Sequence, residues 1–215
     1  PICFTTSSWV GMKKGDLHYN ISQPGWAKFF WSSFFAPWNM GATILGYHSD
    51  KFVPKEQLQT IQDLGVTTFC APPTALRVLI LVDLKSYDFK LRQCVAAGEP
   101  LNPEIIDVWK EGTGITIRDG YGQSESTAMI ANLPNEKIKY GSMGKPAFLY
   151  DIVIADDEGN ITVDDIAKSV GEDVVIIKEK LCGKEDFIIN EAMTINVELF
   201  PDIPFKTLFS HYKND

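Results

Sequence analysis

The segment from Arg118 to Ser126 gathers the side chains best suited to chemistry in this sequence. It reads Arg-Asp-Gly-Tyr-Gly-Gln-Ser-Glu-Ser and combines glycines, a tyrosine, an amide, hydroxyls and a carboxylate. Gln123 and the serine hydroxyls can hydrogen-bond a ligand, and Glu125 can hold a metal ion or balance a cationic group. Glycine lets the backbone approach a ligand such as a nucleotide closely. This combination indicates a ligand-binding loop.

A short strand must position this loop. Residues 114–118 alternate apolar and polar side chains, which is typical of a strand. In α/β folds, ligands bind outside the carboxyl ends of the strands. We therefore expect the polar loop to lie at such a strand end.

Strands and helices alternate through the middle of the chain. The hydrophobic pattern predicts strands over 66–71, 91–98 and 114–118 and helices over 54–64, 74–82 and 104–111. Thr74 is a plausible N-cap, and Gly112 is expected to stop the last helix. This alternation predicts an α/β fold with a largely parallel sheet flanked by helices.

The first part of the chain is less regular. Residues 1–22 are polar and turn-rich, and Thr5 to Ser8 are expected to form a capped polar turn. Aromatic residues then recur every three to four positions after residue 26, which favours a mostly buried helix, followed by a buried strand over 41–47. Trp26, in the turn before that helix, is the best candidate for lining a ligand pocket.

The pattern changes after about residue 145. A strand is expected over 150–155, a hairpin-type turn over 156–160, and several short β-like runs after it. We therefore predict an α/β core over 1–146 and a smaller, mainly antiparallel β unit over 147–215.

Composition narrows the function classes. The 215-residue chain is 45% hydrophobic and 22% charged, as in ordinary globular proteins, and its net charge of −8 argues against non-specific nucleic-acid binding. The sequence contains no run of 18 apolar residues, so it predicts no membrane span, and its N-terminus does not resemble a signal peptide.

The four cysteines are widely spaced and form no CxxC pair. Cys70 and Cys94 lie in apolar, strand-like runs, so buried free thiols are the expected state. Free thiols favour a reducing compartment, which we take to be the cytoplasm, or the mitochondrial matrix in a eukaryote.

Two strand-end motifs together resemble one family. Gly98-Glu99-Pro100 follows one predicted strand, and Tyr121-Gly122-Gln123-Ser124-Glu125-Ser126 follows the next. The pair resembles the adenylate-forming superfamily of acyl-CoA synthetases, adenylation domains and luciferases, with Ser124 where the family has threonine. The segments 15–26 and 141–146 are similar to the acetyl- and medium-chain acyl-CoA synthetase branch.

That resemblance implies a two-step reaction. A carboxylic acid would attack the α-phosphate of ATP, giving an acyl-adenylate and pyrophosphate, and the thiol of coenzyme A would then displace AMP. Mg²⁺ and positioned donors must offset the repulsion between the two anions.

The resemblance also implies a role for each motif residue. Ser124 and Glu125 would be catalytic, with Glu125 the Mg²⁺ ligand. Trp26 and Ala97 would border the acyl pocket. The nucleotide-binding residues would be Gly98, Glu99, Pro100, Asp119, Gly120, Tyr121, Gly122, Gln123 and Ser124.

Simpler roles stay open for several of these residues. Gly98 and Gly122 could be turn glycines, and Tyr121 could be a half-buried tyrosine at a strand end. Ser124 and Ser126 could cap a helix that begins there, with Glu125 in its first turn, where the helix dipole favours a carboxylate.

The resemblance covers only part of the family's catalytic machinery. It places the family's phosphate loop before residue 1, and its ribose-binding aspartate and catalytic lysine after residue 215. We therefore expect a partial acyl-CoA synthetase, weak or inactive alone, acting on short- to medium-chain or branched acids. The alternatives are a non-catalytic remnant that binds a nucleotide, an acyl group or a partner, and one subunit of a split enzyme completed by another chain.

Overall fold

The computed structural model describes residues 2–150 and residue 152. The chain forms two compact units, Pro1–Lys145 and Pro146–Asp215. The strand, turn and β unit expected after residue 150 lie almost wholly outside the described residues. The helices, the sheet and the candidate site described below belong to the first unit, apart from the last residue of the final strand.

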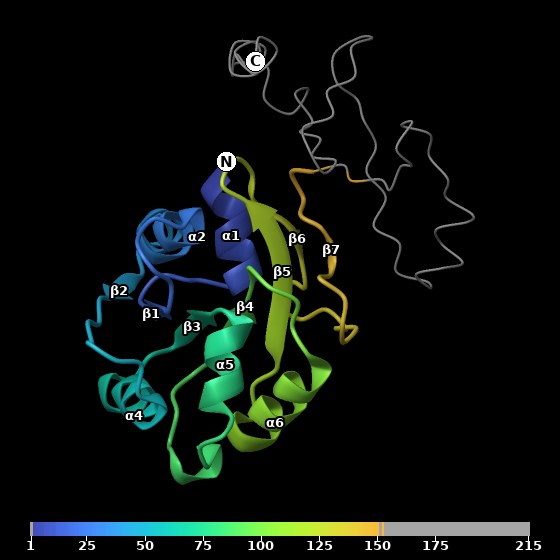
Figure 1. Ribbon diagram of the computed structural model, residues 1–215. Helices are drawn as coiled ribbons and strands as arrows, with labels where there is room; N and C mark the ends of the chain where they lie inside the picture. The colour runs from blue at the N-terminus through green and yellow to red at the C-terminus, as the bar shows by residue number, and fades with distance from the viewer. Residues whose placement is uncertain (1, 151, 153–215) are drawn as a thin grey trace, which may run out of the picture. The chain divides into compact units, whose positions relative to one another are not determined.

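A mainly parallel sheet forms the centre of the first unit (Figure 1). Its strands, in the order β2-β1-β3-β4-β5-β6-β7 across the sheet, are β1 (Leu17–Asn20), β2 (Thr43–Leu45), β3 (Thr68–Ala71), β4 (Gln93–Ala96), β5 (Ile117–Gln123), β6 (Thr127–Ala131) and β7 (Lys145–Pro146). The pairs from β2 to β5 are parallel, and β6 runs antiparallel to β5. The predicted α/β class is confirmed.

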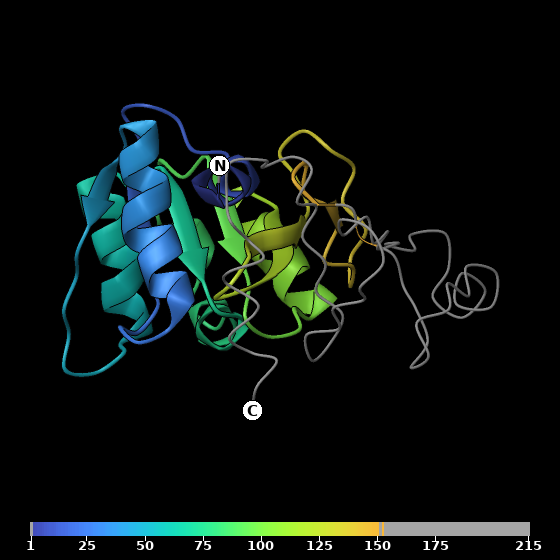
Figure 2. The same ribbon diagram turned by 90° about the horizontal axis from the view of Figure 1, so that it is seen from above.

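Helices cover both faces of this sheet (Figure 2). The helical segments are α1 (Ile2–Val10), α2 (Ala27–Phe30), the π-helical turn η1 (Trp31–Phe35), α3 (Ala36–Met40), α4 (Pro54–Leu64), α5 (Pro73–Leu79), the 3-10 turn η2 (Leu84–Ser86) and α6 (Pro103–Thr113). Within the described residues, no helix has the length and apolar character that a membrane crossing requires.

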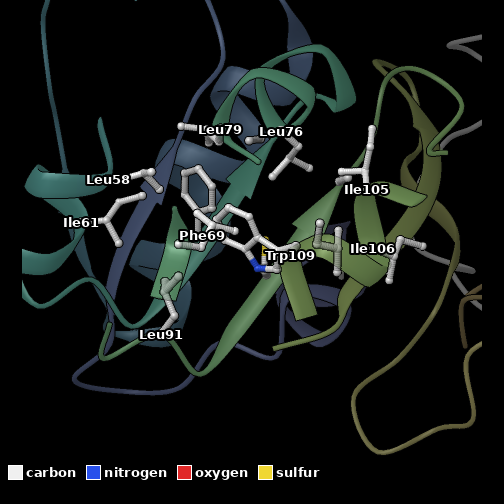
Figure 3. Close-up of a cluster of buried hydrophobic side chains, with 14 of the residues drawn as sticks. Leu58, Ile61, Phe69, Leu76, Leu79, Leu91, Ile105, Ile106 and Trp109 are labelled. Carbon is white, nitrogen blue, oxygen red and sulfur yellow. The ribbon is translucent and has the colours of Figure 1, made fainter. Parts of the chain in front are cut away.

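The larger core lies between the sheet and helices α4, α5 and α6 (Figure 3). Phe69 of β3 and Trp109 of α6 stack at its centre, with ring centroids 6.0 Å apart and planes inclined by 19°. Leu58 and Ile61 of α4 and Leu76 of α5 are fully buried around them. Burying aliphatic and aromatic side chains in this way fixes the sheet that carries the candidate site.

The second core lies on the opposite face and contains α1. The predicted polar turn over Thr5 to Ser8 is wrong, because these residues lie within α1. Thr5, Thr6 and Ser7 are buried, and the Thr5 hydroxyl lies 2.9 Å from the hydroxyl of Thr127. Tertiary packing that satisfies these hydroxyls outweighs their low helix propensity.

Arg118 of β5 joins this helix to the sheet. Its guanidinium donates to the carbonyl oxygens of Trp9, Val10 (3.1 Å) and Asn132 (2.9 Å), and to the side chain of Gln93 at 2.7 Å. The last carbonyls of a helix lack partners within the helix, so a buried arginine at this position satisfies them. Burial lowers the pKa of Arg118 to about 10.

The aromatic segment is helical from Ala27 to Met40, but it is not the buried helix that its composition predicts. Small residues, Ser32, Ser33, Ala36 and Pro37, are its buried side chains. Four large aromatics are exposed instead: Trp26, Phe30, Phe35 and Trp38. The spacing of the aromatic residues therefore predicted the helix correctly but not the side that faces the protein.

Most of the other element boundaries differ from the prediction by a few residues, and three of the differences affect a named residue or strand. The strand expected over 41–47 is the three-residue edge strand β2, whose first residue is exposed. Helix α6 continues through Gly112 to Thr113 and is capped by Gly114, which adopts the left-handed conformation that suits a glycine cap. Helix α5 begins after Pro72, and its Thr74 hydroxyl donates to Glu99 at 3.3 Å instead of capping the helix.

Candidate functional site

The two motif loops lie side by side at the carboxyl ends of β4 and β5. In the parallel register of these strands, Ala96 pairs with Asp119. The chain leaves β4 through Ala97 and turns at Gly98, whose φ of +101° is a conformation that side chains other than glycine rarely adopt. Gly98, Glu99 and Pro100 are exposed there. The structure therefore brings both predicted motifs together at the carboxyl ends of two neighbouring strands.

The second motif is a β-hairpin and not the start of a helix. β5 extends to Gln123, and β6 returns from Thr127 in antiparallel pairing with an irregularity between Tyr121 and Gly122. A Cβ atom on Gly122 would lie 1.6 Å from the carbonyl oxygen of Thr127. The alternative in which Ser124 and Ser126 cap a helix is therefore wrong. Gly122 is required because the return strand occupies the space of a side chain.

Backbone strain marks the return strand. Thr127 has a φ of +61°, although it is β-branched. Such residues rarely adopt this conformation, and holding one there costs on the order of 1–3 kcal/mol. Strained residues of this kind cluster at functional sites.

Hydrogen bonds order the tip of the hairpin. The Gln123 amide side chain donates to the Tyr121 hydroxyl at 3.1 Å, and the Gln123 backbone N–H donates to the Ser126 hydroxyl at 3.1 Å. Ser124 and Glu125 are exposed beyond this bonded part. Their side chains can therefore reach a ligand without breaking the hairpin.

Asp119 lies at the base of the hairpin and is buried. Its carboxylate accepts the backbone N–H of Gly120 at 2.8 Å, and its carbonyl oxygen accepts the side chain of Asn132 at 3.2 Å. Burial raises the pKa of Asp119 to about 6, while the Gly120 N–H and the charge of Lys28 act in the opposite direction. Gly120 packs against Trp9, whose ring would lie 2.6 Å from an added Cβ.

Two residues at this site were missed by the sequence analysis. Lys28 of α2 donates its ammonium to the carbonyl oxygen of Ala97 at 3.0 Å. Trp31 of η1 donates its indole N–H to the carbonyl oxygen of Ser124 at 3.3 Å. Both act on backbone atoms far away in sequence, so no local motif could have identified them.

The predicted acyl-pocket residues are less closely assembled. Ala97 lies directly beside the candidate nucleotide residues and is held by Lys28. Trp26 precedes α2 in an extended conformation, and 67% of its surface is exposed. The role of both residues in acyl binding stays a prediction.

Glu125 is compatible with Mg²⁺ only as part of a shared coordination shell. Among residues 2–150 and 152, no group of three or more histidine, cysteine, aspartate or glutamate side chains could hold a metal ion. Mg²⁺ is commonly bound through one or two carboxylates together with substrate phosphates and water. An exposed single carboxylate fits that arrangement.

A shallow pocket of about 210 Å³ lies elsewhere, between η2 and α6. It is lined by Val82, Asp83, Leu84, Lys85, Val108, Glu111 and Gly112. None of the candidate residues lines it. The candidate site is instead formed by the loops at the carboxyl ends of β4 and β5.

Comparison with known proteins agrees with the two motifs. The family model described as AMP-binding enzyme matches residues 3–176. A 4-hydroxybutyrate–CoA ligase of Metallosphaera sedula is 55% identical over 72% of this chain and 28% of its own length. A mitochondrial acyl-coenzyme A synthetase of Rattus norvegicus is 38% identical over 95% of this chain and 31% of its own length.

A solved structure has the same fold. The anthranilate CoA ligase AuaEII, in complex with anthranoyl-AMP, superposes with a TM-score of 0.68 and 29% identity over 74% of this chain and 32% of its own. This chain thus spans about a third or less of these relatives. The family match over most of its length identifies the chain as a member of the AMP-binding enzyme family, whose matching relatives are acyl-CoA synthetases.

Proposed function

We propose that this chain forms the adenylate-binding part of an AMP-forming acyl-CoA synthetase. The observation that carries the proposal is the pairing of Ala96 with Asp119, which brings the Gly98-Glu99-Pro100 turn and the Tyr121–Ser126 hairpin together. A nucleotide held between them would meet a glycine turn on one side and a tyrosine ring on the other.

Each residue of the hairpin has a chemical task in this proposal. Tyr121 stacks on the adenine, an interaction that nucleic-acid bases generally make with aromatic rings. Its hydroxyl is already bonded to Gln123, which keeps the ring oriented and the amide beside the base. Asp119 and Gly120 supply the backbone of the adenine platform, and Gly98, Glu99 and Pro100 flank the base.

Ser124 and Glu125 serve the reacting groups. The Ser124 hydroxyl hydrogen-bonds the α-phosphate or the acyl carboxylate, because both are anions that need donors as they approach. The carboxylate of Glu125 would hold Mg²⁺, which would neutralise charge between the phosphates and the incoming acid. Coenzyme A then accepts the acyl group as a thioester and AMP leaves.

The acid belongs to the short- to medium-chain or branched class in this proposal. Trp26 and Ala97 border the acyl group next to the hairpin. A relative named for 4-hydroxybutyrate supports a small acid. We keep the cytoplasm, or the mitochondrial matrix in a eukaryote, as the predicted location.

Titration of AMP into the 215-residue chain tests the nucleotide site. We expect saturable binding, weakened about tenfold or more by Tyr121→Ala, because stacking on an aromatic ring contributes about 1–3 kcal/mol per base. Tyr140→Ala, which removes another half-buried tyrosine, one that packs against the larger core, is the control and should leave the AMP affinity unchanged. Absence of AMP binding to the unsubstituted chain would overturn the proposal.

A second titration tests the Mg²⁺ role of Glu125. Mg²⁺ should strengthen ATP binding to the unsubstituted chain, and Glu125→Gln should remove most of that increase. Glu56→Gln, which neutralises an exposed carboxylate on α4, is the control. An undiminished Mg²⁺ effect in Glu125→Gln would exclude Glu125 as the ligand.

Turnover by these residues alone is expected to be weak. The residues that resemble the family carry the adenylate side of the site, and phosphate stabilisers contribute several kcal/mol to such barriers. Release of pyrophosphate from ATP and butyrate should therefore stay near background. Robust release by the 215-residue chain would contradict this expectation.

A further inference from the structure

Lys28 and Trp31 project from the same side of one helical segment. They are three positions apart, a spacing that puts two side chains on one helix face. Lys28 donates to the carbonyl oxygen of Ala97, 69 residues away, and Trp31 donates to the carbonyl oxygen of Ser124, 93 residues away. One helix face therefore holds both loops of the candidate site through their backbones.

The helix is itself fixed to the sheet beneath it. The side chain of Asn20 in β1 donates to the hydroxyl of Ser33 at 3.0 Å and to the carbonyl oxygen of Lys28 at 3.4 Å. Ser32 and Ser33 are buried. These small buried side chains let the helix approach β1 closely. The position of the helix on the sheet therefore fixes the positions of the two carbonyl groups that Lys28 and Trp31 bind.

A π-helical turn begins at Trp31, the residue that reaches the hairpin. Trp31 is the first residue of η1, between the α-helical segments α2 and α3. A π-turn contains one residue more than an α-helical turn and so re-aims the side chains that follow, and such turns are frequent at functional sites. In this chain the irregular turn coincides with the residue that reaches the hairpin.

The ammonium of Lys28 also acts electrostatically on the site. It lowers the pKa of Asp119, against the larger opposite effect of burial. Ala97, the residue that Lys28 holds, lies one position after Ala96, the register partner of Asp119. Lys28 thus acts on the end of β4 and the base of the hairpin together.

We propose that Lys28 and Trp31 form a clasp, a pair of positioning residues that ties the aromatic helix, residues 27–40, to both loops of the adenylate site. This inference rests on the proposed function, because the clasp serves nucleotide and acid binding. A carboxylic acid against the aromatic helix and a nucleotide between the loops then stabilise the same arrangement. Binding of one ligand should therefore raise the affinity for the other by an equal factor.

Amide hydrogen exchange without ligand tests the clasp directly. The backbone N–H groups of Gln123 and Ser126 are bonded within the hairpin, so their exchange reports its opening. We expect Trp31→Phe, which removes only the indole donor, to accelerate exchange at these amides at least threefold. Lys28→Met should do the same at Ala97 and Gly98.

Matched variants separate positioning from general destabilisation. Trp38→Phe makes the same change on an exposed tryptophan of the same helical segment, and Lys51→Met does so on an exposed lysine. Both should leave the loop amides unchanged, and Lys28→Arg should restore the rate because it retains the donor. The amides of Phe69 and Val95 in the core strands serve as the internal reference. Unchanged loop exchange in Trp31→Phe and Lys28→Met would overturn the clasp.

A coupled titration tests the functional consequence. AMP affinity is measured with and without saturating butyrate. The clasp variants should bind AMP about threefold to tenfold more weakly, as expected for one lost hydrogen bond, and should lose the increase that butyrate gives. Equal coupling in the clasp variants and the unsubstituted chain would overturn the clasp alone. No AMP binding by the unsubstituted chain would overturn the proposed function and the coupling, while the exchange data would still report on the two hydrogen bonds.

Discussion

At the scale of single residues, the candidate site combines buried polar groups at its base with exposed groups at its tip. Asp119 is buried and carries a raised pKa, whereas Ser124 and Glu125 are exposed. The buried residues at the base of the hairpin hold it rigidly, and the exposed tip leaves hydrogen-bond donors and a carboxylate free for a ligand. The properties of Asp119 and Gly122 each lead to a prediction.

Asp119 should make stability depend on pH in a defined direction. Its pKa is about 6 in the folded chain against an ordinary value of 3.8, so the folded state disfavours its ionised form. Stability from this group is therefore lost as pH rises from about 4 to about 6. Asp119→Asn should gain up to about 3 kcal/mol over the unsubstituted chain across that window.

Thermal or urea unfolding of both proteins between pH 4 and pH 7.5 measures this difference. His18 titrates in the same region, because burial lowers its pKa to about 4, but it is present in both proteins and cancels in the comparison. A stability difference that is independent of pH would show that Asp119 is not the titrating group.

Gly122 should tolerate no side chain. Gly122→Ala would place a Cβ atom against the backbone of Thr127, and backbone atoms cannot move aside cheaply. We expect loss of AMP binding together with faster amide exchange across β5 and β6. Gly46→Ala is the control, because nothing lies within 4 Å of its added Cβ. Normal AMP affinity in Gly122→Ala would mean that the hairpin geometry is not needed for binding.

At the scale of elements, β5 organises the site because it connects β4, β6 and α1. It pairs with β4 on one side and β6 on the other, and Arg118 connects it to the end of α1. The hairpin tip therefore extends from a strand that is held along its length. The aromatic helix adds a further attachment through Trp31.

Replacing Arg118 tests how much this connection contributes. Arg118→Met keeps the length of the side chain but leaves the carbonyl oxygens of Trp9, Val10 and Asn132 without their donor. Buried acceptors without partners cost about 1–3 kcal/mol each, so we expect a loss of at least 3 kcal/mol in urea unfolding. Arg77→Met on the exposed face of α5 should change stability by less than about 0.5 kcal/mol. A loss below 1 kcal/mol in Arg118→Met would mean that water replaces the guanidinium.

At the scale of the whole first unit, the sheet separates two apolar cores and carries the candidate site at the carboxyl ends of β4 and β5. Cys70 contributes to the core beside α1, and Cys94 contributes to the core beside α6. Both are free thiols, and burial raises the pKa of each. The expectation of buried free thiols at these two positions is confirmed.

The reactivity of these thiols should report opening of the sheet. Because only a thiolate reacts rapidly, alkylation of Cys70 and Cys94 by iodoacetamide should require unfolding. Mass spectrometry of individual peptides should find both cysteines protected in native buffer and modified in urea. The Trp109→Ala variant, which opens a cavity in the larger core, should accelerate modification of Cys94. Rapid alkylation of either cysteine in the native chain would contradict the packing described for the sheet.

Sequence pattern and family resemblance predicted the parts of this protein that depend on local periodicity and short motifs. Alternating strands and helices gave the α/β class, and the helix over 54–64 has the bounds of α4. The two motifs identified the family that comparison then established. Local pattern suffices for such features because strand and helix periods, and a run of six motif residues, are contained within short segments.

Tertiary structure alone decided which segments face one another. Thr5 and Ser7 read as turn residues until their hydroxyls meet Thr127 and the carbonyl oxygen of Ala36. Helix capping by Ser124 and Ser126, an alternative that the sequence leaves open, is excluded only by the pairing of β6 with β5. Lys28 and Trp31 act on carbonyl oxygens, which every residue possesses, so their side-chain types do not reveal their partners. The sequence determined the family and the residues of the adenylate motif, whereas the sheet register and long-range hydrogen bonds determined how those residues are held.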